Sequence, residues 1–247
     1  MIKLSRPDCP RELELRKKEL TDDYKVTKKS VWKKKFITEP LLKMSYEKCA
    51  FCECKLVEEG KYMQVEHFHH KNSYEDEVVD WSNLLPICIR CNTHKLDHDT
   101  YENEIIDPTI KNPKDHLLFH KYRILGKDTI GKLTVEVLDL NNTTEIATPR
   151  FQIGNGIYEK LEEILVIIDN YIETANDSLE KAKVIRKVKS TLKKGTEVGI
   201  YSATVATVLL NAPDYQVMKA EMQRKNIWTN QIQDIEDSIT KIALDVR

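Results

Sequence analysis

Two pairs of cysteines constrain the fold of this chain more than any other feature of its sequence. Each pair has the spacing C-x2-C, Cys49 with Cys52 and Cys88 with Cys91. Such a turn places two thiolates on one edge of a metal ion, and two turns complete the tetrahedron that zinc prefers. The pairs are separated by residues 53–87, a longer insertion than in a common zinc finger. We therefore expect a structural zinc ion that holds both ends of this insertion together.

The two remaining cysteines leave one alternative open. Cys54 could replace Cys52 as a ligand, although the spacing of the second pair favours Cys52; Cys9 is expected to be an ordinary thiol. Residues 1–20 lack the apolar core of a signal peptide, and no apolar run approaches the roughly 20 residues of a membrane span. We therefore expect a cytoplasmic protein, whose thiols stay reduced and favour metal over disulfides.

The insertion and the residue that follows it carry the groups of a hydrolytic site. Glu66 and Asn92 offer hard oxygen ligands of the kind that suit Mg²⁺ or Mn²⁺. His67 is a candidate general base, because the imidazole of histidine has an ordinary pKa of about 6.5. Asn83 could hold the loop that bears His67 by hydrogen bonding to its backbone. We expect a catalytic divalent ion at Glu66 and Asn92, beside a base at His67.

This order of residues resembles the HNH, or ββα-metal, nuclease superfamily. The matching segments are Glu66-His67, Asn83 within WSNLL, and CIRCN at residues 88–92. The resemblance implies a ββα-metal core in which His67 activates water and Asn83 orients this base. It also implies that Glu66 and Asn92 bind the metal. Asn92 stands where such nucleases commonly have histidine, so His94, two residues further on, is the alternative ligand.

The resemblance narrows to the HNH subunit of the Septu anti-phage system, which is also found as a retron effector. It rests on the segments CAFCE, VEHFHHK, WSNLLPICIRCNTHK and IIDPTIKNPKDHLLF, and it covers residues 1–150. His70 departs from the pattern EHF-x-P-K, in which relatives often have proline. The family implies a PtuA-like ABC-type ATPase as partner and DNA or host tRNA as substrate. Its retron variant implies a reverse transcriptase with its RNA-DNA.

Substrate contacts must come from local cations, because the formal net charge is only −1. Lys95 and His94, on the helix expected after Cys88, are predicted to contact the substrate. The segment KKSVWKKKF, residues 28–36, is a second cluster, in which helical spacing would put Trp32 and Phe36 on one face. Two interpretations of this cluster stay open: aromatic rings that pack inward beneath solvated lysines, or a phosphate-contacting patch beside the site.

Hydrophobic periodicity predicts an α+β domain over residues 1–150 and a helical region over residues 151–247. The elements expected in the first domain are a helix over 11–24, a helix from Pro40, a β-hairpin over 55–68 that turns near Gly60, a helix from Cys88 and an antiparallel β meander over 120–140. Apolar residues at helical spacing from Ile157 to Ile172 predict a helix that continues to Lys194.

The helical region leaves more than one role open. We expect it to dock the partner, with capping of the nuclease domain as the alternative. Its basic part, residues 181–194, could also touch nucleic acid. A second class of function stays open for the whole chain, namely a zinc-stabilised nucleic-acid-binding or scaffold subunit without catalysis. An isoelectric point of about 6.7 favours dependence on a partner for capturing the substrate.

Overall fold

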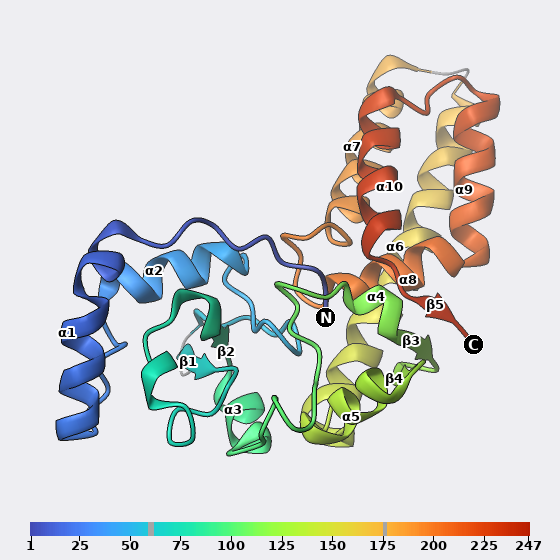
Figure 1. The fold of residues 1–247 in the computed structure, drawn as a ribbon. Coiled ribbons are helices and arrows are strands. Elements are labelled where there is room, and N and C mark those ends of the chain that lie inside the picture. The colour runs from blue at the N-terminus through green and yellow to red at the C-terminus, as the bar shows by residue number, and fades with distance from the viewer. Residues whose placement is uncertain (59–61, 175–176) are drawn as a thin grey trace. The chain divides into compact units, whose positions relative to one another are not determined.

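The computed structural model describes residues 1–58, 62–174 and 177–247, and the chain forms two compact units (Figure 1). The first unit comprises Met1–Leu117 with Leu125–Leu140, and the second comprises Leu118–Ile124 with Asn141–Arg247. In the described part of the chain, no helix is both long enough and apolar enough to span a membrane. The predicted α+β class is confirmed, since helices predominate and the sheets are small.

The first unit opens with two helices, α1 (Arg11–Thr27) and α2 (Lys35–Met44). Helix α1 ends at Lys28, which adopts the left-handed conformation with a φ of 55° and bonds the carbonyl of Tyr24. Residues 28–34 are not helical, so helical spacing does not relate Trp32 to Phe36 as the sequence had suggested.

Helix α2 contains Pro40 in its interior, so the expectation that the helix begins at this proline is wrong. Proline removes one backbone hydrogen bond from a helix interior, a loss that tertiary packing must offset. The offset comes from Ile37, Leu41 and Met44, which recur at helical spacing and are buried.

Two short strands and a helix form the centre of the first unit. Strand β1 (Gln64–His67) pairs antiparallel with β2 (Leu84–Ile87), with Glu66 opposite Leu85. Helix α3 (Ile89–Lys95) follows β2 directly and contacts β1, which gives a strand–strand–helix order. The hairpin expected within residues 55–68 is therefore wrong in its pairing, and its turn residue Gly60 lies outside the described residues.

The meander expected over residues 120–140 is wrong in its second half. Strands β3 (Leu117–His120) and β4 (Arg123–Gly126) are joined by Lys121 and Tyr122, both at positive φ, as in a tight hairpin turn. A helix, α5 (Thr129–Val137), then replaces the expected strands. Its start is fixed by the carboxylate of Asp128, which accepts a hydrogen bond from the Gly131 amide at 2.7 Å. Three shorter helical turns complete this part of the chain: η1 (Glu75–Glu77), η2 (Trp81–Asn83) and α4 (Pro113–His116).

The second unit is built mainly of helices, as the helical C-terminal region predicted. They are the π-helical turn η3 (Thr143–Ala147), α6 (Thr148–Glu173), α7 (Ser178–Lys193), α8 (Ser202–Asn211), α9 (Pro213–Arg224) and α10 (Asn230–Ile242). Helix α6 contacts α7, α8 and α9 through a buried stripe that includes Ile157, Leu161 and Ile164. The single helix expected to run to Lys194 is instead two, and Asp177 caps the second by accepting hydrogen bonds from two backbone amides.

A short C-terminal strand adds a third strand to the sheet of β3 and β4. Strand β5 (Asp245–Val246) pairs in parallel with β3, with Leu118 opposite Asp245, and the sheet has the order β4-β3-β5.

Candidate functional site

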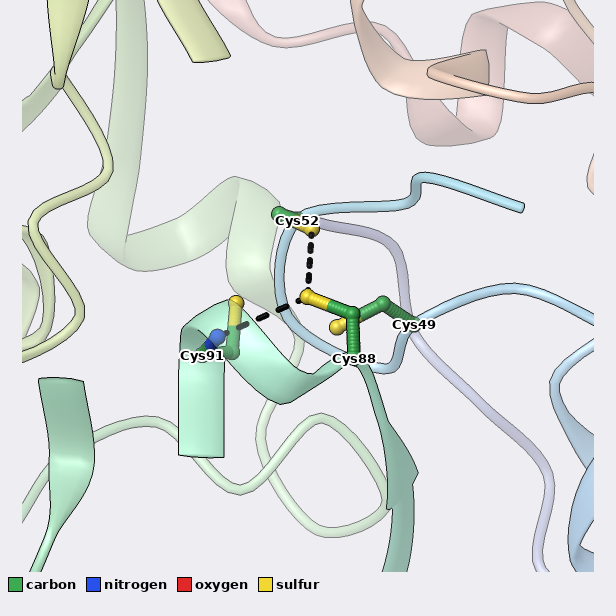
Figure 2. Close-up of side chains that lie close together, drawn as sticks. All are labelled: Cys49, Cys52, Cys88 and Cys91. Carbon is green, nitrogen blue, oxygen red and sulfur yellow. Dashed lines mark hydrogen bonds between the residues drawn. The ribbon is translucent and has the colours of Figure 1, made fainter. Parts of the chain in front are cut away.

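Four thiols of the first unit gather at one point (Figure 2). The sulfur atoms of Cys49, Cys52, Cys88 and Cys91 all lie within 4.8 Å of one another. Cys49 and Cys52 belong to the loop after α2, whereas Cys88 and Cys91 belong to the start of α3. The Sγ atoms of Cys52 and Cys88 are 3.7 Å apart. A tetrahedral zinc ion with Zn–S bonds of about 2.3 Å separates its sulfurs by about 3.8 Å. The cluster could therefore hold a zinc ion, and Cys52 belongs to it as the spacing favoured, whereas Cys54 does not.

Backbone hydrogen bonds hold the two halves of this cluster in place. Cys88 is the N-cap of α3, and its sulfur accepts a bond from the Cys91 amide at 3.5 Å. The amide of Ala50, between the first two cysteines, bonds the carbonyl of Pro86 in β2 at 2.9 Å. The thiol cluster therefore ties the loop around residue 50 to the end of β2 and the start of α3. A metal bound there would fix the position of α3 and hence of Asn92.

A polar pocket of about 140 Å³ lies between β1 and α3. Glu66 and His67 from β1 and Asn92 from α3 all line it. A larger and mainly apolar groove of about 1050 Å³ runs beside α2, and Glu66, His67 and Asn92 take no part in it. The structure therefore brings together the three residues that the sequence analysis proposed for the base and the catalytic metal.

The imidazole of His67 is held by one hydrogen bond and is almost entirely buried. Its Nε2 lies 2.9 Å from the carbonyl oxygen of Val78, and a carbonyl can only accept, so Nε2 carries the proton. In the described part of the chain Nδ1 has no hydrogen-bond partner. The side chain is only 4% exposed, and this burial lowers the pKa of His67 to about 3. The ring is therefore neutral at neutral pH, with a free lone pair on Nδ1.

Glu66 is held by a buried lysine. Its Oε1 accepts a hydrogen bond from Lys95 Nζ at 2.7 Å, and the same ammonium donates to the His67 carbonyl at 3.1 Å. Burial raises the pKa of Glu66, and the positive charge of Lys95 opposes that rise. Lys95 therefore lies inside the protein against Glu66, and not at the surface where a phosphate contact was expected. The second carboxylate oxygen, Oε2, makes no hydrogen bond to the described residues.

Two of the other proposed residues lie outside the pocket. Asn83 is buried, and its side chain accepts from the His69 amide at 2.7 Å and donates to the carbonyls of His69 and Glu77 at 3.1 Å each. Asn83 thus fixes the backbone of His69, two residues beyond His67, by hydrogen bonding. His94 is exposed and faces Asp139, with 3.9 Å between Nε2 and the nearer carboxylate oxygen.

Asn92 has an amide that is free to act as a ligand. Its side chain forms no hydrogen bond within the described part of the chain, although it lines the pocket. Among the residues considered for the last ligand, Asn92 is therefore at the pocket and His94 is not.

The pocket also contains residues that the sequence pattern did not assign to the site. Trp32 and Lys33 line it from the loop between α1 and α2, and Lys71 lines it from the loop after β1. The indole of Trp32 meets the His67 ring edge-on, with centroids 4.4 Å apart. The lysine-rich composition of residues 28–36 was the available signal for Lys33, whereas the sequence contains no local signal for Lys71 or for the carbonyl of Val78.

The fold and the thiol cluster define an α+β protein with a candidate zinc centre and a helical second unit. No family model matches the chain. A curated relative, the Septu protein PtuB of Bacillus thuringiensis, is 40% identical over 236 residues, which cover 95% of this chain and 92% of the relative. Identity of this extent places the chain in the Septu PtuB family.

Proposed function

We propose that this protein is a metal-dependent HNH endonuclease, which hydrolyses phosphodiester bonds in DNA or tRNA as the effector of a Septu anti-phage system. One observation carries the proposal: Glu66, His67 and Asn92, from a strand and a helix, line a single polar pocket. The strand–strand–helix order around that pocket agrees with a ββα-metal core. Membership of the Septu PtuB family supports a role in Septu anti-phage defence.

His67 is the general base of the proposed reaction. Its Nδ1 accepts a proton from a water molecule in the pocket, while the hydrogen bond from Nε2 to Val78 holds the ring and fixes this tautomer. Asn83 acts as a positioning residue, because its three hydrogen bonds hold the backbone that follows His67.

The donor set of the pocket fits a hard divalent cation. Glu66 offers its free Oε2, and Asn92 offers an amide oxygen that no described residue engages. Mg²⁺ or Mn²⁺ held by these residues would supply positive charge against a phosphate oxygen and the departing 3′ oxygen. The positive charge of Lys95 favours the ionised form of the Glu66 carboxylate and holds its Oε1 in place.

A cleavage assay tests the proposal. Supercoiled plasmid and tRNA would be incubated with the protein, alone and with its co-purified partner, in Mg²⁺ or Mn²⁺. We expect His67→Ala to lower the cleavage rate by at least about 100-fold, as for loss of a general base. His94→Ala is the matched control and should cleave like the unsubstituted protein. If His67→Ala and the unsubstituted protein cleave equally, the proposed base is wrong.

One observation favours the second candidate, a zinc-stabilised scaffold or nucleic-acid-binding subunit without catalysis. His67 is only 4% exposed and is covered by Trp32, so an approaching water or phosphate has little room in this conformation. This candidate predicts that His67→Ala retains phage protection in cells and zinc content. The endonuclease predicts that the same variant keeps its zinc and loses protection.

We also propose that the second unit docks a PtuA-like ABC-type ATPase. Truncation from about residue 200 would remove α8 to α10, which pack against α6 and α7, and would unfold the unit rather than test docking. Single surface substitutions test docking without unfolding the unit. The variants are Val166→Asp and Val217→Asp, whose side chains are 60% and 52% exposed. Val26→Asp of the first unit, at 84% exposure, is the control. Loss of ATPase co-purification with either second-unit variant supports the assignment, and co-purification equal to the control in both contradicts it.

A further inference from the structure

Two lysines line the proposed catalytic pocket without an anionic partner. Lys33 is exposed and Lys71 is half-buried, and neither forms an ion pair with any residue that the structure describes. Other lysines nearby are neutralised: Lys17 pairs with Asp80 at 2.8 Å, and Lys28 pairs with Glu75. The lining of the pocket thus carries two positive charges that no described residue neutralises.

The backbone that carries Lys33 is fixed against the candidate base. Its neighbour Trp32 is buried, contacts the His67 ring edge-on at 4.4 Å, and packs against Tyr24 with ring centroids 5.7 Å apart. Val31, on the other side of Trp32, is also buried. Because two consecutive side chains anchor this loop, the position of Lys33 relative to His67 is set by packing and not by the lysine itself.

Lys71 approaches the pocket from the opposite segment, four residues beyond His67. It lines the same pocket as Glu66 and His67. An anion bound in the pocket would face this cation and Lys33 together.

We propose that Lys33 and Lys71 form a two-lysine clamp for the phosphate that is to be cleaved. The inference deepens the proposed endonuclease function and rests on it. It assigns substrate binding to residues from the α1–α2 loop and the loop after β1. Ammonium groups bind phosphate as point charges without needing a fixed geometry, which suits a site that accepts any nucleic-acid sequence. A chain with a net charge of −1 depends on such local cations to hold a polyanion.

Binding measured without cleavage tests the clamp. The full zinc-loaded chain would be titrated with a fluorescently labelled 30-nucleotide DNA without added Mg²⁺ or Mn²⁺ and without chelator, by anisotropy, between 50 and 200 mM KCl. We expect Lys33→Gln and Lys71→Gln each to weaken binding and to reduce the slope of log K against log salt by about 1, the signature of one lost phosphate contact. Lys29→Gln, which removes an exposed lysine of the same loop outside the pocket, should leave both quantities unchanged.

A second probe separates phosphate binding from other effects. A DNA with methylphosphonate linkages lacks the backbone charge, so the clamp predicts equal affinity of the double variant Lys33→Gln/Lys71→Gln and the unsubstituted protein for it. Equal binding of charged DNA by the clamp variants and Lys29→Gln overturns the inference, as does undetectable binding by the unsubstituted protein at 50 mM salt. Cleavage of plasmid or tRNA in Mn²⁺ is followed in the same preparations. If the unsubstituted protein cleaves and the clamp variants cleave equally well, only the clamp fails; if no nucleic acid is cleaved, the proposed function fails.

Discussion

Lys95 and Glu66 form an ion pair with 2.7 Å between Nζ and Oε1, and the lysine side chain is fully buried beside a carboxylate that is 6% exposed. The pair joins α3 to β1, and through the second bond of Lys95 it reaches the carbonyl of His67. Two charges removed from water in this way stabilise each other only while both are present.

Removing one partner of this pair should therefore destabilise the first unit strongly. We expect Lys95→Met to lower the free energy of unfolding by about 3–5 kcal/mol, because the Glu66 carboxylate is left buried and unpaired. The double variant Lys95→Met/Glu66→Gln should lose less than the sum of the two single changes. Urea unfolding followed by circular dichroism measures each value. Lys18→Met, an exposed lysine of α1, is the control and should change stability by less than about 0.5 kcal/mol; a Lys95→Met value equal to it would contradict the role of the pair.

Asn83 should stabilise the first unit through its hydrogen bonds to the backbone. Its side chain makes three hydrogen bonds to the backbone of His69 and Glu77, so Asn83→Ala leaves these groups unpaired in a buried setting. We expect a loss of about 2–4 kcal/mol in unfolding free energy and a cleavage rate that falls with little change in KM. Asn72→Ala, which removes a single bond to the Tyr24 hydroxyl, is the control. A cleavage rate unaltered in Asn83→Ala would show that the hydrogen bonds of Asn83 do not position the base.

The sequence predicted those site residues that stand at a recognisable spacing along the chain. The C-x2-C pairs and the order Glu66-His67, Asn83, Asn92 are read directly from the chain, and the zinc ligands follow from tetrahedral geometry. Residue spacing does not predict whether a side chain is buried. Lys95 lies three residues after Asn92 on the same helix, so a shared face was foreseeable, whereas its burial against Glu66 depends on how α3 meets β1.

Two secondary-structure predictions failed because tertiary contacts, and not the local sequence pattern, decide the structure there. The segment from Thr129 to Val137 alternates apolar and polar β-branched residues and favoured strands, yet the Asp128 cap and the burial of Gly131 and Thr134 select a helix. The partner of β1 lies beyond the polar loop in β2, and strand pairing of that kind is set by tertiary contacts.

Zinc should be bound by the four clustered thiols and by no other cysteine. We expect about one zinc per chain by mass spectrometry of the metal content, lost in Cys49→Ser and Cys91→Ser because a tetrahedral site missing one thiolate binds much more weakly. Chelation of the metal should lower the unfolding temperature of the first unit. Cys9→Ser is the control and Cys54→Ser tests the competing ligand; both should keep their zinc. Zinc loss in Cys54→Ser, with retention in Cys52→Ser, would reverse the assignment of the first pair.

The second unit contains a buried tyrosine that should make its stability fall at alkaline pH. The Tyr215 hydroxyl donates to Glu236 Oε1 at 2.7 Å, and the side chain is fully buried. Burial, followed by this hydrogen bond and the carboxylate charge, raises the pKa of Tyr215 well above its usual value near 10. The unfolded chain then releases the tyrosine proton at a lower pH than the folded chain, so the stabilisation is complete below about pH 10 and declines above it.

We expect the unfolding free energy to fall by at most about 1.4 kcal/mol per pH unit from this group. Tyr215→Phe should show a smaller alkaline decline, and Tyr62→Phe, at an exposed site of 78%, serves as the control. Equal pH profiles for the unsubstituted chain and Tyr215→Phe, measured by urea unfolding from pH 8 to 11, would contradict this coupling.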